Sequence, residues 1–327
     1  MIIKQKDETA RVVKQIADFQ SGKLKPLVTS VDYIDYHGMG GLYPGTVVLI
    51  GGLSGSGKTY ELERIIRGIA KNQPEEDYIV VSCTWEIEAF KTITRAISKH
   101  TGKTAKEILL SPPTEEDIKS YTEVLQQFRT DNTYLQPEPV NVEEFIKDMT
   151  TIINKHKDKP ILITIDNLEN ILVGSEGQKT ALDNLTRAVN SLKKLGSFVS
   201  FILLNQLNAN IETRENPQNH VPIASDLYGS NAGFKLADIV AVKHLPYKLG
   251  IEEYSIFPKG RYKYIDPYFI KEGKGKLNKF KGMGNGFIHI LKSRNTIEEY
   301  DSIDVYPIKI FDVPQEEEKK EFEEFDY

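Results

Sequence analysis

The chain has 327 residues, of which 39% are hydrophobic and 27% are charged, and its net charge at pH 7 is −5. This length and composition are typical of a soluble globular protein with one large or two small α/β domains, and the apolar runs are too short for a membrane-spanning helix. Cys83 is the only cysteine, which excludes an intrachain disulfide and a cluster of cysteine metal ligands. Because the start lacks a signal-peptide core, we expect a cytoplasmic protein with no membrane partner.

The first predicted element is a short amphipathic helix over residues 7–20, followed by the linker-like sequence SGKLKP. Its apolar side chains fall on one side, at Val12, Val13, Ile16 and Phe19. The pattern leaves two interpretations open: the helix packs on its own domain, or it docks on a neighbouring copy of the chain.

A glycine-rich loop lies at the centre of the prediction. The apolar run 46–50 predicts a buried parallel strand, and ELERIIRGIA predicts a helix. Between them GGLSGSGKTY matches G-x4-G-K-T, a loop whose backbone N–H groups wrap a phosphate at a helix N-terminus. A flexible Gly/Ser loop is the alternative, which the flanking strand and helix disfavour. The phosphate-binding residues that we predict are Gly52, Ser54, Gly55, Ser56, Gly57, Lys58 and Thr59.

This loop predicts binding of ATP or another nucleoside triphosphate together with Mg²⁺. In such a loop the lysine, here Lys58, reaches the β- and γ-phosphates, and the hydroxyl of Thr59 binds the metal. A strand over 161–165 ends at Asp166. An acid at the end of a buried strand downstream of a phosphate loop is typical of the second half of a Mg-nucleotide site, so we predict that Asp166 binds the metal through water.

Two further polar side chains follow predicted strands. Glu86 comes just after a strand over 78–82, where it could activate a water that faces the γ-phosphate. Glu88 competes for this role, and an acid that merely opens the next helix is the structural alternative. Gln206 follows a strand over 198–204, where it could sense the γ-phosphate or only cap the strand.

The remaining stretches are more polar. Residues 101–158 look helical and interrupted by prolines, and we expect helices packed on one edge of the sheet. A long polar loop follows Gln206, and SNAGFKLADIVAV predicts a helix and a strand. Residues 247–286 are basic and rich in tyrosine, which would suit single-stranded nucleic acid or else a solvated β-hairpin. The strand GFIHILKSRN then places Lys292 and Arg294 on the same side of an extended chain.

The acidic charge is concentrated at the C-terminus. Residues 315–327 carry seven acids and two lysines, which is the whole net charge of −5, so the body of the chain is neutral overall. A charged tail of this composition is typical of a disordered segment that either solubilises the protein or docks on a basic partner. Net charge therefore does not exclude a nucleic-acid partner.

Several blocks, in this order, resemble the RecA-type motor domain of a DnaB-type (superfamily 4) replicative helicase. They are GGLSGSGKT, TWEIEAF, ITIDNLENIL, LLNQLN, PIASDLYGSNAGFKLADI and ILKSRN, and the resemblance covers about residues 5–312. It implies a RecA-like P-loop core with a mostly parallel central sheet flanked by helices. The implied divisions are a linker helix (1–25), a motor domain (26–312) with the basic insertion at 247–286, and the tail (313–327).

The resemblance also implies roles and partners. Glu86 would activate the attacking water, Gln206 would couple the γ-phosphate to loops 207–222 and 226–233, and Lys292 and Arg294 would act in the neighbouring subunit's ATP site. The helix 7–20 would dock on an adjacent subunit of a ring, which the resemblance implies to be a hexamer. Such helicases hydrolyse ATP and move 5′–3′ on single-stranded DNA in the cytoplasm of a bacterial or phage-infected cell, with a primase, loader or single-strand-binding protein as partner.

This sequence departs from the family pattern in places. No helical N-terminal collar domain corresponds, and Tyr228 with Gly229 replaces the usual pore-loop arginine, so we expect DNA contacts from Tyr228, Gly229 and Asn231. Thr296 replaces the glycine after KSRN. A filament-forming RecA/RadA-like ATPase, which uses ATP as an assembly switch, is the main alternative. A small-molecule P-loop kinase explains fewer of the blocks.

Overall fold

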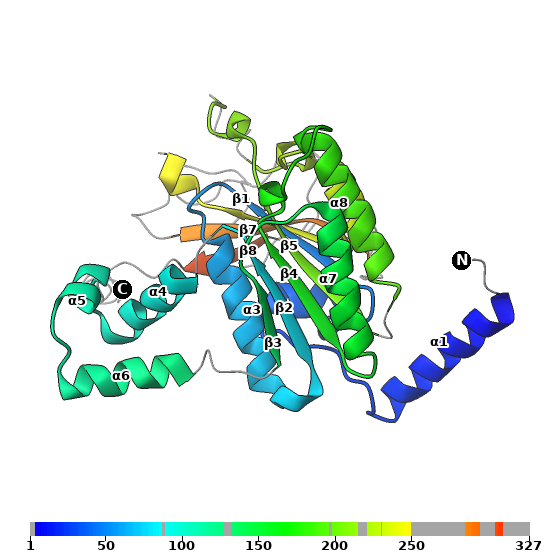
Figure 1. The fold of residues 1–327 in the computed structure, drawn as a ribbon. Coiled ribbons are helices and arrows are strands. Elements are labelled where there is room, and N and C mark those ends of the chain that lie inside the picture. Colours follow the sequence, from blue (N-terminus) through cyan, green and yellow to red (C-terminus); the bar gives the residue numbers. More distant parts are fainter. Residues whose placement is uncertain are drawn as a thin grey trace, which may run out of the picture.

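Residues 4–86, 89–126, 132–195, 198–214, 221–229, 231–249, 285–294 and 305–309 are described in the computed structural model of the chain. They contain an eight-stranded sheet in the order β3-β2-β4-β5-β1-β6-β7-β8 (Figure 1). The strands are β1 (Val47–Gly52), β2 (Ile79–Thr84), β3 (Thr133–Gln136), β4 (Ile161–Asp166), β5 (Val199–Gln206), β6 (Ile239–His244), β7 (Asn285–Ser293) and β8 (Val305–Lys309). The pairings from β3 to β6 are parallel, whereas β7 and β8 are antiparallel. This sheet confirms the predicted α/β, mostly parallel fold.

Helices lie on both faces of the sheet and beyond one side of it (Figure 1). The α-helices are α1 (Gln5–Gln20), α2 (Asp32–His37), α3 (Lys58–Asn72), α4 (Ala89–Thr101), α5 (Ala105–Leu110), α6 (Glu115–Gln126), α7 (Val142–Lys155), α8 (Gln178–Leu192) and α9 (Asn231–Leu236). Short 3₁₀ turns are η1 (Glu75–Asp77), η2 (Leu168–Asn170), η3 (Ala209–Ile211), η5 (Ala224–Asp226) and η6 (Pro246–Leu249). Within the described ranges, no helix has the length and apolar character needed to cross a bilayer.

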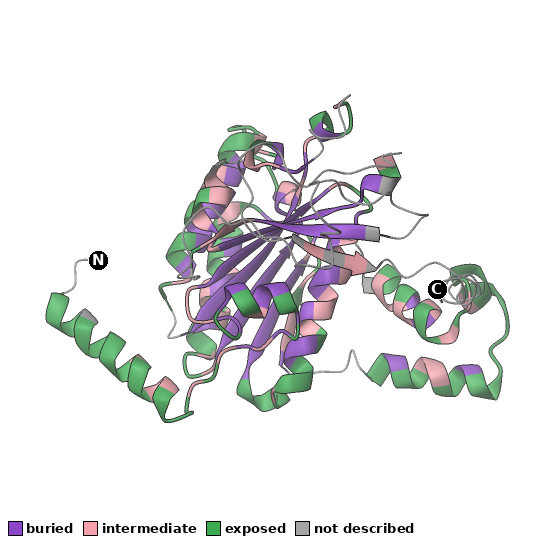
Figure 2. Cartoon of the chain, turned by 180° about the vertical axis from the view of Figure 1, so that it is seen from behind, coloured by how far each residue is buried: buried purple, intermediate pink, exposed green. Residues whose placement is uncertain are grey.

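The central strands are apolar on both faces because helices cover both (Figure 2). Alternate strand residues belong to two cores. On one face Leu49 and Phe201 pack with Phe145 of α7 and Leu185 of α8. On the other face Ile50, Ile202 and their neighbours pack with α2 and α3. This double burial explains why the strands read as continuous apolar runs in the sequence.

The helical prediction for residues 101–158 was wrong in one part. Residues 133–136 form β3, a short edge strand that pairs with β2 in parallel. Moreover, α7 covers a face of the sheet and does not pack on its edge, because Phe145, Met149 and Ile153 are buried in the core of that face. Helices α4 to α6 do lie beside the sheet (Figure 1). A strand of four residues is too short to show an alternating pattern, and pairing with β2 determines its conformation.

Helix α1 confirms the helix predicted near the start and projects away from the sheet (Figures 1 and 2). Val12, Val13 and Ile16 are 40%, 59% and 51% exposed. The end of the helix packs on the domain, where the Phe19 ring lies 5.2 Å from that of Tyr43. The apolar stripe of α1 is therefore left largely uncovered by its own domain.

Candidate functional site

The glycine-rich loop joins β1 to α3 in the way that its sequence predicts. Gly55 and Gly57 have φ angles of +69° and +82°, which side-chain-bearing residues rarely adopt. Lys58 follows as the first residue of α3 and is only 7% exposed. Its Nζ donates to the carbonyl oxygens of Gly52 (2.9 Å) and Leu53 (3.1 Å). The lysine is therefore folded back onto its own loop.

Burial lowers the pKa of Lys58, and the carboxylates of Glu86, Glu169 and Asp166 partly oppose this effect. Burial disfavours the charged form of Lys58, and a phosphate placed beside the lysine would favour that form again. The loop N–H groups at the start of α3 also favour an anion. The loop can thus hold a phosphate with its backbone and neutralise it with Lys58.

Thr59 and Asp166 meet across the carboxyl ends of β1 and β4. The Thr59 hydroxyl donates to Asp166 Oδ2 at 2.8 Å, while Asp166 Oδ1 is buried and has no hydrogen-bond partner among the described residues. Burial raises the pKa of Asp166 to about 6, with the Thr59 hydrogen bond opposing this rise and Glu86 adding to it. A divalent cation would satisfy the unpaired oxygen and favour the charged carboxylate.

The donor set fits Mg²⁺, which prefers oxygen ligands and keeps several waters. In the part of the chain that the structure describes, no group of three or more His, Cys, Asp or Glu side chains is placed to hold a metal ion. Mg²⁺ would therefore depend on Thr59, Asp166 and the phosphates themselves, as in other sites where the nucleotide completes the coordination.

Glu86 lies next to this pair. Its backbone N–H donates to the carbonyl of Asp166 at 3.1 Å, and its Oε2 accepts from Asn167 Nδ2 at 2.7 Å. The side chain is exposed. An exposed carboxylate oriented by an amide can accept a proton from a water, which is the geometry that a general base requires. The competing Glu88 lies outside the described residues.

Gln206 lies at the end of β5, beside Gly52 of the phosphate loop. Sequence reasoning missed the two side chains that fix its surroundings. Glu169 of η2 accepts from the Gln206 N–H (2.8 Å) and from Asn205 Nδ2 (2.9 Å). Burial raises the pKa of Glu169, and its hydrogen bond from Gln206 opposes the rise. An acid three residues after Asp166 and a buried asparagine at a strand end were the available signals.

Two lysines that sequence reasoning also missed contact the phosphate loop from β6 and η6. Lys243 Nζ donates to the Gly57 carbonyl (3.3 Å) and lies 3.6 Å from Glu61 Oε2. Lys248 Nζ donates to the Gly55 carbonyl (2.6 Å). Lys243 is 7% exposed, and burial lowers its pKa. A lysine directly after the apolar run IVAV was the signal for it.

Tyr228, one of the three predicted DNA-contacting residues, lines a hollow beside the phosphate loop. A cavity of about 480 Å³ extends from Leu53 of the phosphate loop to Tyr228, which is 41% exposed. Gly229 has φ +72°, and a Cβ there would lie 2.5 Å from the Leu182 side chain. Asn231 is the first residue of α9. The basic segment predicted at 247–286 lies almost wholly outside the described residues, apart from its two ends.

Lys292 and Arg294 do not join this site. Lys292 Nζ donates to the carbonyls of Phe234 (2.6 Å) and Lys235 (3.0 Å), and Arg294 pairs with Asp238 Oδ1 (3.1 Å) and also donates to the Lys235 carbonyl. Burial lowers the pKa of Lys292 to about 8, and Arg294 adds to this effect. Both cations converge on the C-terminal end of α9 and the residues that join it to β6.

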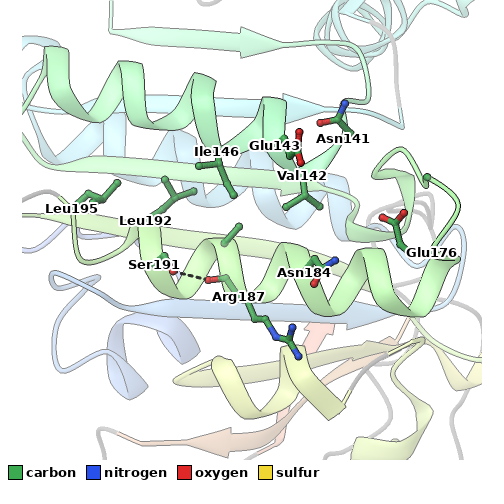
Figure 3. Close-up of a pocket in the computed structure, with 12 residues that line it drawn as sticks. Asn141, Val142, Glu143, Ile146, Glu176, Asn184, Arg187, Ser191, Leu192 and Leu195 are labelled. Atoms are coloured by element: carbon green, nitrogen blue, oxygen red, sulfur yellow. Dashed lines mark hydrogen bonds between the residues drawn. The ribbon is translucent and has the colours of Figure 1, made fainter. Parts of the chain in front are cut away.

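The larger cavity, of about 550 Å³, lies elsewhere, between α7 and α8 (Figure 3). Ile146, Leu192 and Leu195 line one part of it, and Glu143 and Arg187 lie along its margin (Figure 3). It contains none of the predicted site residues, so its size alone does not identify a nucleotide site.

Comparisons with known proteins agree with this fold. Residues 27–265 match the family model described as the DnaB-like helicase C-terminal domain. The fold is similar to the ATPase domain of G40P, with a TM-score of 0.67 and 17% identity over 95% of this chain and 96% of that one. It is also similar to a DnaB-like replicative helicase in a structure that describes its interactions with primase, with a TM-score of 0.62 and 16% identity. That match covers 92% of this chain and 64% of the other. No curated protein sequence matches.

Proposed function

Because the chain belongs to the DnaB-like helicase C-terminal domain family, we propose that it is an ATP-dependent DNA helicase that works as a ring on single-stranded DNA. The observation that carries the proposal is the division of the chemistry between two ends of one sheet. Lys58, Thr59, Asp166 and Glu86 meet at one end, while Arg294 lies at the other. A chain built in this way has a complete site only where two copies meet.

In the proposed reaction the loop N–H groups and Lys58 hold the β- and γ-phosphates. Thr59 and Asp166 would hold Mg²⁺, which neutralises charge on the phosphates. Glu86, oriented by Asn167, accepts a proton from the water that attacks the γ-phosphorus. Breaking the bond between the γ-phosphorus and its bridging oxygen yields ADP and phosphate.

Lys292 and Arg294 are proposed to act on the ATP of a neighbouring subunit. Cations supplied by a neighbour stabilise the charge that develops on the phosphoryl group and make hydrolysis depend on assembly. Repeating this head-to-tail contact closes into a ring when its rotation allows, and a hexamer is our proposal for that ring. Both side chains would leave their present partners around Lys235 and Asp238 to reach the phosphates.

Helix α1 is proposed to connect the subunits. Its exposed residues Val13 and Ile16 form an uncovered stripe on a projecting helix, and a contiguous exposed apolar stripe is typical of an interaction surface. Leu110 and Ile118, on α5 and α6, are 74% and 53% exposed and offer surface of the same kind on the other side of the domain. Docking of α1 on an adjacent copy would cover such a stripe.

DNA is proposed to pass the Tyr228 side of the site. Gln206 would pass the state of the γ-phosphate to Tyr228, Gly229 and Asn231, and 5′–3′ movement is the direction that we expect. A primase, loader or single-strand-binding protein is a proposed partner in the cytoplasm of a bacterial or phage-infected cell. The linker (1–25), motor (26–312) and tail (313–327) divisions are proposals as well.

The test is the ATPase rate per subunit against protein concentration, with and without single-stranded DNA, at two salt concentrations, followed by strand displacement from a forked duplex. We expect the rate to rise with concentration and again with DNA, and the effect of DNA to weaken in high salt. DNA-stimulated hydrolysis without strand displacement, together with filaments, would favour the RecA/RadA-like alternative. A rate that responds to neither variable would contradict the helicase.

A further inference from the structure

Glu169 lies between the phosphate loop and the segment that carries Tyr228. One carboxylate oxygen, Oε1, accepts from the Gln206 N–H at 2.8 Å and from Asn205 Nδ2 at 2.9 Å. The same Asn205 Nδ2 also donates to the Tyr228 carbonyl at 3.2 Å. A single amide therefore bridges Glu169 to the backbone of Tyr228, and Asn205 is only 1% exposed.

The Tyr228 segment is attached to the end of β5 by its backbone. The Tyr228 N–H donates to the Gln206 carbonyl at 2.8 Å, and the Asn208 N–H donates to the Asp226 carbonyl at 2.7 Å. Leu207 and Leu227 form an antiparallel bridge between these two bonds. Any shift of the end of β5 is therefore transmitted to Tyr228, because short backbone hydrogen bonds move their partners together.

Glu169 also faces the nucleotide side. Its carboxylate is close enough to Lys58 for each charge to affect the pKa of the other. The Gly52 carbonyl accepts from Lys58 Nζ (2.9 Å) and from the Leu207 N–H (3.2 Å). Glu169 Oε2 is buried and makes no hydrogen bond among the described residues. A phosphate that draws Lys58 away would thus change the bonding of Gly52, which pairs in the sheet with Gln206, the residue whose N–H donates to Glu169 Oε1.

We propose that Glu169 is the positioning residue through which occupancy of the phosphate site is passed, by way of Asn205, to the Tyr228 segment. This inference rests on the proposed DNA-dependent ATPase and adds a second path beside Gln206. Glu169 acts through the hydrogen bonds that its Oε1 accepts, so an amide at this position preserves the path, whereas a methyl group breaks it. The path has two states, because Lys58 is hydrogen-bonded either to the loop carbonyls or to phosphate. Coupling between two sites requires two such states.

The test compares Glu169→Ala, Glu169→Gln and Asn205→Ala with the unaltered protein. Fluorescence anisotropy gives the Kd for a labelled oligo-dT with ADP and with a non-hydrolysable ATP analogue, and a fluorescent nucleotide gives nucleotide affinity without DNA. Coupling is the ratio of the larger of these two Kd values for DNA to the smaller, so a ratio of one means that the nucleotide has no effect on DNA affinity. We expect Glu169→Ala and Asn205→Ala each to lower this ratio by about tenfold, and Glu169→Gln to leave it within about twofold. Nucleotide affinity without DNA should change by less than about threefold in all three.

A double-variant cycle adds a readout that general destabilisation would not produce. If both residues lie on one path, Asn205→Ala should have no further effect on the ratio in the Glu169→Ala background. Glu176→Ala, which removes an exposed carboxylate nearby in the chain, is the matched control and should leave the ratio unchanged. If Glu169→Ala does not fold, Asn205→Ala alone decides the proposal.

The outcomes separate this inference from the proposed function. If the unaltered protein shows no nucleotide-dependent DNA affinity, the proposed function fails and takes the inference with it. If the unaltered protein shows the ratio and both alanine variants keep it, only the role of Glu169 is overturned. Loss of nucleotide binding in Glu169→Ala, or loss of the ratio in Glu169→Gln, would also overturn it, because the residue would then act on the nucleotide itself or through its charge.

Discussion

Lys58 and Arg294 lie at opposite ends of the same sheet. Lys58 follows the phosphate loop at the carboxyl end of β1, whereas Arg294 follows β7, whose last residue, Ser293, pairs with Ile239 beside Val48 near the start of β1. The six residues of β1 span about 20 Å, which is beyond the reach of one arginine side chain. Within one subunit these two cations therefore cannot act on the same phosphate.

Mixing two inactive variants tests this arrangement. We expect Lys58→Ala and Arg294→Ala each to lose ATPase activity alone, and a mixture in equal amounts to recover about a quarter of it. An interface is complete when the Arg294→Ala subunit supplies Lys58 and the Lys58→Ala subunit supplies Arg294. Random assembly gives this arrangement at about a quarter of interfaces. The measurement is phosphate release at increasing total protein. Full activity of Arg294→Ala alone, as a monomer, would show that the arginine does not act in trans.

Replacing Lys58 with methionine is expected to weaken nucleotide binding. Loss of the charge-assisted bonds to phosphate should cost about 3 kcal/mol, or about a hundredfold in Kd for a fluorescent ATP analogue. Lys248→Met is the matched control, because Lys248 also bonds to the loop but is exposed to water. Its effect should stay below about threefold. Equal losses in the two variants would mean that Lys58 has no special contact with phosphate.

Glu86→Gln is expected to separate binding from turnover. The amide can keep a hydrogen bond to Asn167 but cannot accept a proton from water, so kcat should fall by about a hundredfold or more while nucleotide affinity is kept. Single-turnover phosphate release and equilibrium binding give the two quantities. Glu88→Gln is the control at the competing acid. If Glu88→Gln loses turnover and Glu86→Gln does not, the roles are reversed.

The raised pKa of Asp166 predicts a pH dependence of Mg²⁺-assisted binding. Burial places this pKa at about 6, above the ordinary value for aspartate, so the protonated form dominates below that pH. A proton and Mg²⁺ compete for the carboxylate. The gain in nucleotide affinity on adding Mg²⁺ should therefore be present above about pH 6 and be lost as the pH falls through it. Titration calorimetry with Mg²⁺ or EDTA measures the gain, and Asp166→Asn should remove both the gain and its pH dependence.

A charge on the exposed stripe of α1 is expected to disrupt assembly. Val13→Asp places a carboxylate in a surface that we propose to be buried against another subunit, whereas Ala10→Asp adds the same charge to an exposed position on another face of the helix. Sedimentation velocity with ATP should show smaller species for Val13→Asp at a concentration where Ala10→Asp and the unaltered protein form rings. Unchanged assembly of Val13→Asp would exclude the stripe from the interface.

Local sequence determined much of the core of this protein. The phosphate loop is encoded within one short segment, because its glycines permit the positive φ angles and the residues on either side form a strand and a helix. Asp166, Glu86 and Gln206 were found at strand ends because parallel strands bring their carboxyl ends to one edge. The family blocks, which depend on residue order alone, agree with the match over residues 27–265.

Tertiary structure decided which distant side chains surround that loop. Glu169 and Asn205 meet only because β4 and β5 are neighbours in the sheet, and Lys243 reaches the loop only because β6 pairs with β1. Strand β3 forms because β2 offers an unpaired edge, although its own four residues carry no alternating pattern. Which strands become neighbours in the sheet depends on how both faces of the sheet are buried, and residues from the whole chain contribute to that burial. A short stretch of sequence therefore encodes the phosphate loop, but it does not encode which side chains the other strands bring to that loop.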